Sequence, residues 1–224
     1  MINPRLHLLT EVGNVEVWRV DGRMIRDKLD IEFTVAEHHY SSPYVPEREI
    51  WIDRESVDTE EWRAWGARAD RERSIARSGA PLEVASRFGQ MLEEAIRKDW
   101  RKAIDFAALV GQVNDALREM SHRGGELHIE RVPGKVVRDW FTPEFVHGGH
   151  WRVYGFIPEG MIWIDDILSE DEQELTIVHE MHELRLMLKG ASYEKAHPQA
   201  SAAELKLRRA GSSLDGSRSS VQRF

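Results

Sequence analysis

The residues best suited to chemistry lie in one short run of the C-terminal half, His179-Glu180-Met181-His182-Glu183. On a helix, His179 and Glu183 are four residues apart and project from one face, so an imidazole and a carboxylate can bind a single cation. Glu180 directly follows His179, and in zinc hydrolases a glutamate at this position accepts a proton instead of binding the metal. The run therefore predicts a metal site with Glu180 as general base.

A catalytic zinc site usually takes three ligands from the protein, and His197 is the expected third. It lies in the next expected helix, which the turn at Gly190 folds back across the first. Glu204 lies seven residues further along, on nearly the same face, and can either bind the metal or orient His197. The spacing favours Glu183 over His182 as the second ligand. Whether His182 or Glu204 replaces one of these ligands stays open.

A second pair of histidines, in His147-Gly148-Gly149-His150, can also face one ion because the glycines leave room. We favour a structural role here. His150 has a counterpart, His38, in the half of the chain that lacks the helix motif. This repetition favours a shared structural hydrogen bond.

Composition restricts the metal chemistry and the partners. The chain has 224 residues and no cysteine, so a metal must be held by histidines and carboxylates, and a cytoplasmic location is expected. The formal net charge of -8 opposes the broad basic face of a nucleic-acid-binding protein, so nucleic acid is not an expected partner. No stretch is long and apolar enough for a membrane span.

The positioning elements come in two copies. Residues 19–53 align with residues 131–165 at an offset of 112 without a gap, and fourteen of the 35 positions are identical. Unrelated segments of average composition share roughly two. In each copy a short β-type run, a Gly-containing turn and a second apolar run predict a hairpin, and a later strand ends in Ile-Trp-Ile-Asp. The tryptophans of these strands are expected in the core, and the aspartates are expected to cap the following turn.

Two helices follow the strands of each copy. In the second copy, Ser169 and Glu172 have the spacing of a capping box, and the helix is expected to end before Gly190. In the first copy the helix is expected to begin near Asp58 or Thr59 and to end before Gly79. Its arginine-rich stretch, 63–77, alternates with acids and predicts a salt-bridged solvent face.

The first copy serves as an internal control for the metal motif. At an offset of 112, Ala67 aligns with His179 and Arg71 aligns with Glu183. With one residue dropped before the glycines, Ser86 falls opposite His197. The ligands are therefore expected to be absent from the first copy, where the second site is structural or binds substrate.

The run from 179 to 183 with His197 downstream resembles the active-site helix of zincin metallopeptidases, and the strand expected before it follows the zincin order. The resemblance covers the segment 161–197. Zincins carry His-Glu-x-x-His, whereas position 183 is glutamate. The segment is more similar to His-Glu-x-x-Glu runs followed by Tyr-x-x-Ala-His in small bacterial and phage metallohydrolase-like proteins. This resemblance implies zinc, hydrolysis, a base at Glu180 and peptide or amide substrates.

The expected architecture is α+β, a tandem duplication of a sheet followed by two helices, with a zincin-like second half. Residues 1–112 form the repeat without the metal motif, 113–210 form the repeat with it, and 211–224 form a disordered tail.

The favoured function is a zinc-dependent hydrolase of peptide or protein substrates, in which His179, Glu183 and His197 hold the metal and Glu180 is the base. The alternative is a non-catalytic binding protein, associated with a phage or mobile element, in which the cluster holds a structural metal or none. The sequence leaves the substrate, the physiological metal and the oligomeric state open.

Overall fold

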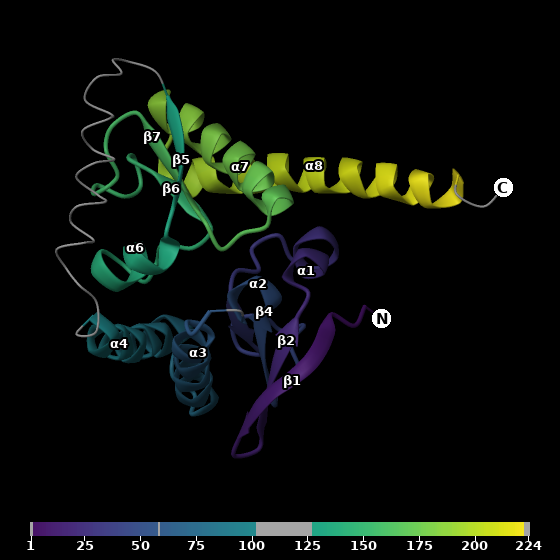
Figure 1. Ribbon diagram of the computed structural model, residues 1–224. Helices are drawn as coiled ribbons and strands as arrows, with labels where there is room; N and C mark the ends of the chain where they lie inside the picture. Colours follow the sequence, from purple (N-terminus) through teal and green to yellow (C-terminus); the bar gives the residue numbers. More distant parts are fainter. Residues whose placement is uncertain (1, 58, 102–126, 222–224) are drawn as a thin grey trace.

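The computed structural model describes residues 2–57, 59–101 and 127–221, which form two α+β halves, each a mixed sheet followed by a helix pair (Figure 1). The first half contains β1 (Arg5–Val12), β2 (Val15–Val20), α1 (Gly22–Lys28), β3 (Ala36–His38), β4 (Glu49–Asp53), α2 (Arg54–Val57), α3 (Trp62–Arg77) and α4 (Leu82–Arg101). The second contains β5 (His128–Val132), α6 (Gly134–Trp140), β6 (Gly148–His150), β7 (Met161–Asp165), α7 (Glu170–Leu188) and α8 (Tyr193–Val221). The predicted duplicated α+β architecture is confirmed.

The division of the chain into three parts stays a prediction. The boundary at residue 112 lies outside the described residues. Helix α8 continues through Val221, and the disordered tail expected over 211–224 likewise stays a prediction. None of the helices in the described ranges is long and apolar enough to span a membrane.

The two sheets share one topology. β2 pairs in parallel with β4, and β3 pairs with β4 in antiparallel fashion; β5, β7 and β6 repeat this arrangement. Strand β1 adds an antiparallel edge to the first sheet. The Ile-Trp-Ile-Asp strands are central in both sheets, and apolar clusters cover both faces. Trp51 is buried in one of these clusters, as predicted.

The predicted hairpin after β2 and after β5 is wrong, because each glycine begins a short helix. Asp21 caps the first of these helices by accepting a hydrogen bond from the Met24 amide, 3.0 Å away. The glycines allow close packing: a Cβ at Gly22 or Gly134 would lie 2.0 or 2.1 Å from a carboxylate oxygen of Asp53 or Asp165. The two aspartates also accept the backbone N–H groups two residues later, which confirms their predicted capping role.

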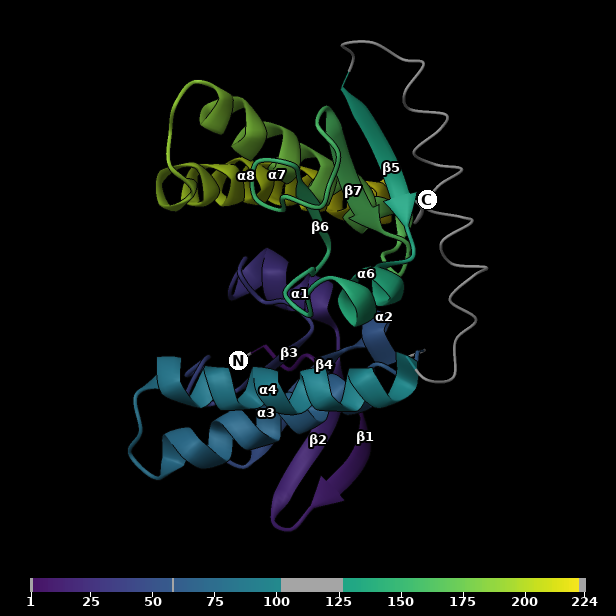
Figure 2. The ribbon, with the colours of Figure 1, turned by 90° about the vertical axis from the view of Figure 1, so that its left-hand side faces the viewer.

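The halves pack against each other reciprocally. Helix α1 of the first half lies against α8 of the second, and α6 of the second lies against α4 of the first (Figures 1 and 2). Figure 2 shows the α3–α4 and α7–α8 pairs on opposite sides of α1 and α6. Elements of both halves therefore meet in the middle of the molecule.

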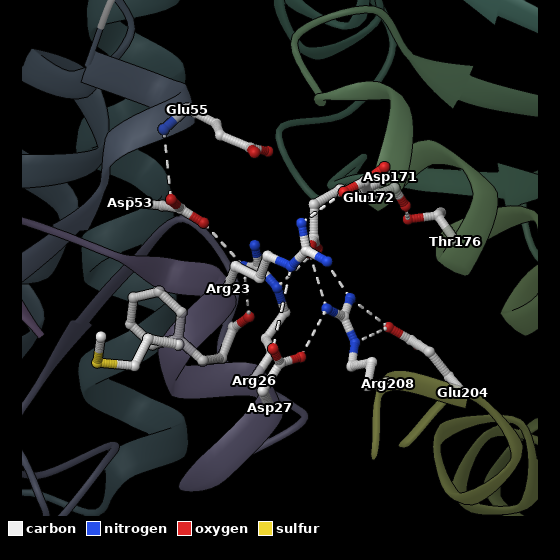
Figure 3. Close-up of polar contacts among 12 residues, drawn as sticks. Arg23, Arg26, Asp27, Asp53, Glu55, Asp171, Glu172, Thr176, Glu204 and Arg208 are labelled. Carbon is white, nitrogen blue, oxygen red and sulfur yellow. Dashed lines mark hydrogen bonds and ion pairs between the residues drawn. The ribbon is translucent and has the colours of Figure 1, made fainter. Parts of the chain in front are cut away.

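Buried ion pairs hold this contact together. Arg26 of the first half binds Asp53 at 2.8 Å and Glu172 of α7 at 3.0 Å, and Arg208 binds Glu172 at 2.8 Å (Figure 3). Arg138 of the second half binds Asp165 and reaches Glu61, beside α3, at 2.7 Å. These side chains are almost fully buried, and burying charge is tolerated only when it is paired in this way.

Candidate metal centre

Helices α7 and α8 bring the predicted metal ligands together. The turn between them contains Gly190, whose φ of 93° lies in the left-handed region, and it reverses the chain so that the helices pack side by side. Ile177, Met181 and Leu184 pack α7 against β7, because their spacing places them on one face. His179 and Glu183 lie on a different face, toward α8 and His197.

Three potential ligand atoms converge on one point. Nε2 of His179 lies 3.2 Å from Nδ1 of His197, which lies 2.8 Å from Oε2 of Glu183. The remaining separation, between His179 Nε2 and Glu183 Oε2, is 3.7 Å. A tetrahedral zinc ion with bonds of about 2.0–2.1 Å keeps its ligand atoms about 3.3 Å apart. The donor atoms therefore fit a small divalent cation without rearrangement of the helices.

In each of the two histidines, a carboxylate contacts the ring nitrogen that does not face the other potential ligands. Nδ1 of His179 lies 3.0 Å from Glu204 on α8, and Nε2 of His197 lies 3.1 Å from Glu32 of the first half. Metal-binding histidines commonly donate their second ring N–H to a carboxylate, which fixes the ring and increases its basicity. Glu204 contacts the ring nitrogen of His179 that faces away from the other ligands, so it is placed to orient His179, and not His197 as the sequence predicted.

A second group of potential ligands consists of His150, Glu180 and Glu183. Nδ1 of His150 accepts the backbone N–H of Arg152 at 3.2 Å, so a neutral ring carries its proton on Nε2. This nitrogen lies 3.1 Å from Oε1 of Glu183, although away from the angle of a good hydrogen bond. His150 is therefore suited to hold Glu183 in place and poorly suited to bind a cation.

The predicted structural hydrogen bond shared by His38 and His150 is confirmed. Nδ1 of His38 accepts a hydrogen bond from the backbone N–H of Tyr40, two residues later, at 3.2 Å. In the same way, Nδ1 of His150 accepts a hydrogen bond from the backbone N–H of Arg152. Both imidazoles are buried. Their equivalent bonds explain why both copies keep this histidine.

The electrostatics of the cluster favour bound positive charge. Burial alone would lower the pKa of His179, but the neighbouring carboxylates of Glu183 and Glu204 raise it to about 10. Hydrogen bonds to Glu183 and Glu32 raise the pKa of His197 to about 9 despite its partial burial. Burial opposes ionisation of Glu183, yet the three neighbouring imidazoles of His150, His179 and His197 hold its pKa well below the usual range. Without a metal, the carboxylates thus retain protons on the imidazoles.

Glu180 lines the pocket beside the cluster. This pocket has a volume of about 110 Å³, and its wall includes His179, His197 and Thr176. Burial raises the pKa of Glu180 to about 7. The structure adds His147 to the same wall, in a left-handed conformation with φ of 64° that is uncommon for a residue with a side chain.

The structure brings His179, Glu180, Glu183 and His197 together, while His182 belongs to neither ligand group found in the described ranges.

Sequence reasoning missed Glu32, which lies 165 residues before His197. Its identity with Glu144 in the aligned copies was the available signal. The stretch 63–77, predicted as a solvent face, instead contains buried Glu72 and Arg73 and a pocket-lining Arg68.

In comparisons with known proteins, no protein-family profile, curated protein or solved structure matches the chain.

Proposed function

We propose that the protein is a metal-dependent hydrolase, with zinc as the metal and peptide or amide bonds as the substrate class. The supporting observation is the convergence of His179, Glu183 and His197, which places three zinc-type donor atoms within 3.7 Å of one another. Two histidines and a glutamate form a ligand set used by zinc hydrolases. The peptide substrate follows from the resemblance to the zincin helix.

When bound, a divalent cation supplies Lewis-acid chemistry, since it polarises a carbonyl oxygen and makes water more acidic. The side chains of this protein contribute binding, orientation and proton transfer. Glu204 and Glu32 hold the two imidazoles in the orientation that presents their other nitrogen. Glu180 lies in the pocket wall, where its carboxylate can accept a proton from water and return it to a leaving amine.

Both halves contribute to the pocket in which substrate would bind. Ile31 and Phe33 come from the first half, and Val146 and Thr176 come from the second. The apolar side chains of Ile31, Phe33 and Val146 form one part of a wall whose other members are mostly polar or charged, so the pocket suits a polar substrate group such as an amide. The first half therefore has a place in the function although it lacks the metal motif.

Zinc content is the primary test. We expect one zinc per chain in wild-type protein after dialysis against zinc, and none in His179→Ala or His197→Ala, measured by elemental analysis. His182→Gln is the matched control, because it alters a histidine of the same helix outside the ligand groups. Absence of zinc from the wild type would overturn the proposal.

The base is tested separately, with a fluorogenic peptide library. Glu180→Gln should retain zinc and lose hydrolysis by about 10²–10⁴-fold, the usual contribution of a general base. Full activity in this variant would refute the role of Glu180. Zinc binding without hydrolysis in the wild type would favour the alternative of a binding protein with a structural metal.

A further inference from the structure

The buried ion pairs reveal a closer correspondence between the helices of the two halves than the sequence alignment gave. Glu61 forms ion pairs with Arg97 and Arg138, at distances of 2.6 and 2.7 Å. In the other half, Glu172 occupies the equivalent position and forms ion pairs with Arg208 and Arg26. Residues 61 and 172 differ by 111, as do residues 97 and 208, whereas the strands correspond at 112. The helices are therefore shifted by one residue.

This shift changes which residues of the first half face the metal ligands. At an offset of 111, Arg68 corresponds to His179, Glu72 corresponds to Glu183, and Ser86 corresponds to His197. The expectation that Arg71 replaces Glu183 was thus wrong, because the gap falls before the helix and not at its end. The first half keeps the metal-ligating carboxylate and lacks the two imidazoles.

The contacts of Arg68 repeat those of the metal ligands. Its Nη1 lies 3.1 Å from Glu93, as His179 lies 3.0 Å from Glu204, the residue equivalent to Glu93. The same Nη1 lies 3.4 Å from Glu144 of the second half. In the metal centre it is the first half that supplies the equivalent acid, Glu32, to His197.

The remaining members of the site also correspond. Nε2 of His38 lies 3.9 Å from Glu72, and Nε2 of His150 lies 3.1 Å from Glu183. Burial raises the pKa of Glu72, while its attraction to Arg68 and a hydrogen bond from Ser86 act in the opposite direction. We use the name N-terminal cradle for the set Glu72, Glu93, Glu144, His38, Arg68 and Ser86.

We propose that the N-terminal cradle is a second copy of the metal site in which the guanidinium of Arg68 takes the place of the metal ion. Glu93 and Glu144 form ion pairs with this guanidinium, and Glu72 adds electrostatic attraction; a buried carboxylate such as Glu93 requires compensating positive charge. In one half a side chain supplies this charge, and in the other a bound cation does. The inference rests on the proposed metal centre.

The cradle is suited to a cation and not to an anionic ligand. The positive charge of Arg68 is already surrounded by Glu93 and Glu144, with Glu72 beside it. A cavity of about 300 Å³ adjoins Arg68 and Ser86 and leaves room for larger side chains at position 86. Replacing both residues by histidine should therefore restore a metal site.

The full-length variant Arg68→His/Ser86→His tests this directly with zinc as the probe. We expect two zinc ions per chain by elemental analysis after equilibrium dialysis, against one in the wild type. In a His179→Ala/His197→Ala background, the same two changes should restore one zinc to a chain that otherwise binds none. The matched control is Arg71→His/Arg87→His, which adds two histidines to exposed positions of the same helices and should add no zinc.

Each outcome decides between the two proposals. One zinc in both the wild type and the Arg68→His/Ser86→His variant overturns the cradle and leaves the metal centre intact. No zinc in the wild type and one in the variant overturns the proposed function, and with it the derivation of the cradle as a copy of a metal site. No zinc in either overturns both.

A reciprocal variant keeps the test decisive if Arg68→His/Ser86→His fails to fold. His179→Arg/His197→Ser gives the metal centre the pattern of the cradle, so it should bind no zinc and melt within a few degrees of the zinc-loaded wild type. His179→Met/His197→Ser, which lacks the charge, should melt clearly lower. Equal melting temperatures for these two variants would contradict a role of arginine as the replacement cation.

Discussion

The carboxylate of Glu183 joins several groups of the metal centre. One oxygen lies 2.8 Å from His197, and the other lies 3.1 Å from buried His150. His179 in turn contacts Glu204, and His197 contacts Glu32, so two layers of side chains fix the ligand geometry. Such outer contacts strengthen metal binding because the rings are already oriented before the cation arrives.

Glu32→Gln should lower zinc affinity by about 10–100-fold, the usual effect of removing a carboxylate behind a metal-binding histidine. The side chain of Glu32 is 53% exposed, so folding should be unaffected. Affinity is measured by competition with a chromogenic chelator. Glu194→Gln, an exposed change on the helix of His197, is the control. An affinity equal to wild type would show that Glu32 does not orient the ring.

Glu37 predicts a pH dependence of stability away from the metal centre. Burial raises its pKa to about 7, with contributions from Glu72 and Asp30 and opposing hydrogen bonds from Ser41 and Ser42. The folded state therefore binds a proton more tightly than the unfolded state, and stability falls as pH rises from about 4.5 to 7. Glu37→Gln removes this loss.

The variant Glu37→Gln should be more stable than wild type by about 3 kcal/mol at pH 8 and equal to it at pH 4, where both side chains are neutral. Urea unfolding at the two pH values measures the difference. A stabilisation of the same size at both would exclude ionisation as the cause.

At the scale of elements, the short helices α1 and α6 depend on the strands that follow them. Gly134 begins α6 at a point where Asp165, at the end of β7, leaves no room for a Cβ. Asp165 also binds Arg138, which lies on the same helix. The glycine, the aspartate and the arginine thus fix the angle between helix and sheet, and Gly22, Asp53 and Arg26 repeat the arrangement.

Gly134→Ala should destabilise the protein by about 3 kcal/mol, because the new methyl group must displace a buried, ion-paired carboxylate. The free energy of unfolding is measured in urea. Gly155→Ala is the control: its Cβ meets nothing within 4 Å, and its stability should stay within about 0.5 kcal/mol of wild type. Similar losses in both variants would show that crowding by Asp165 is not the cause.

At the scale of the whole molecule, the two halves are joined by charges and not by apolar surface alone. Arg97 and Arg138 both bind Glu61 and both lie over the ring of Trp65, at 5.5 and 5.0 Å from its centre. Because one arginine comes from each half, removal of Glu61 leaves two buried cations that face each other. The halves should therefore unfold as one cooperative unit.

Glu61→Ala should cost about 3–5 kcal/mol, the usual effect of breaking a buried ion pair by removing one partner. Asp171→Ala, which breaks the exposed pair with Arg23, should cost less than about 1 kcal/mol. Both values come from urea unfolding followed by circular dichroism and tryptophan fluorescence. Separate transitions in the wild type would refute a single cooperative unit, and equal costs would contradict the importance of burial.

The sequence by itself determined the repeated architecture, the paired helices and the candidates His179, Glu183 and His197. These features depend on local spacing: a duplication preserves residue order, and a helix places residues four apart on one face. The start of α7 after Ser169 was also predicted, but the capping box was not formed. Glu172 turns instead toward Arg26 and Arg208, because a buried ion pair outweighs a local cap.

Only the tertiary structure decided which distant side chains complete each site. Glu32 reaches His197 and Glu144 reaches Arg68 because the halves exchange contacts across the middle of the molecule. The tertiary contacts also corrected the alignment of Glu72 with Glu183. A one-residue gap is invisible in a divergent sequence, yet it rotates a helix by about 100° and changes which residues share a face. Buried charge resolves the ambiguity, since each charge must meet its partner.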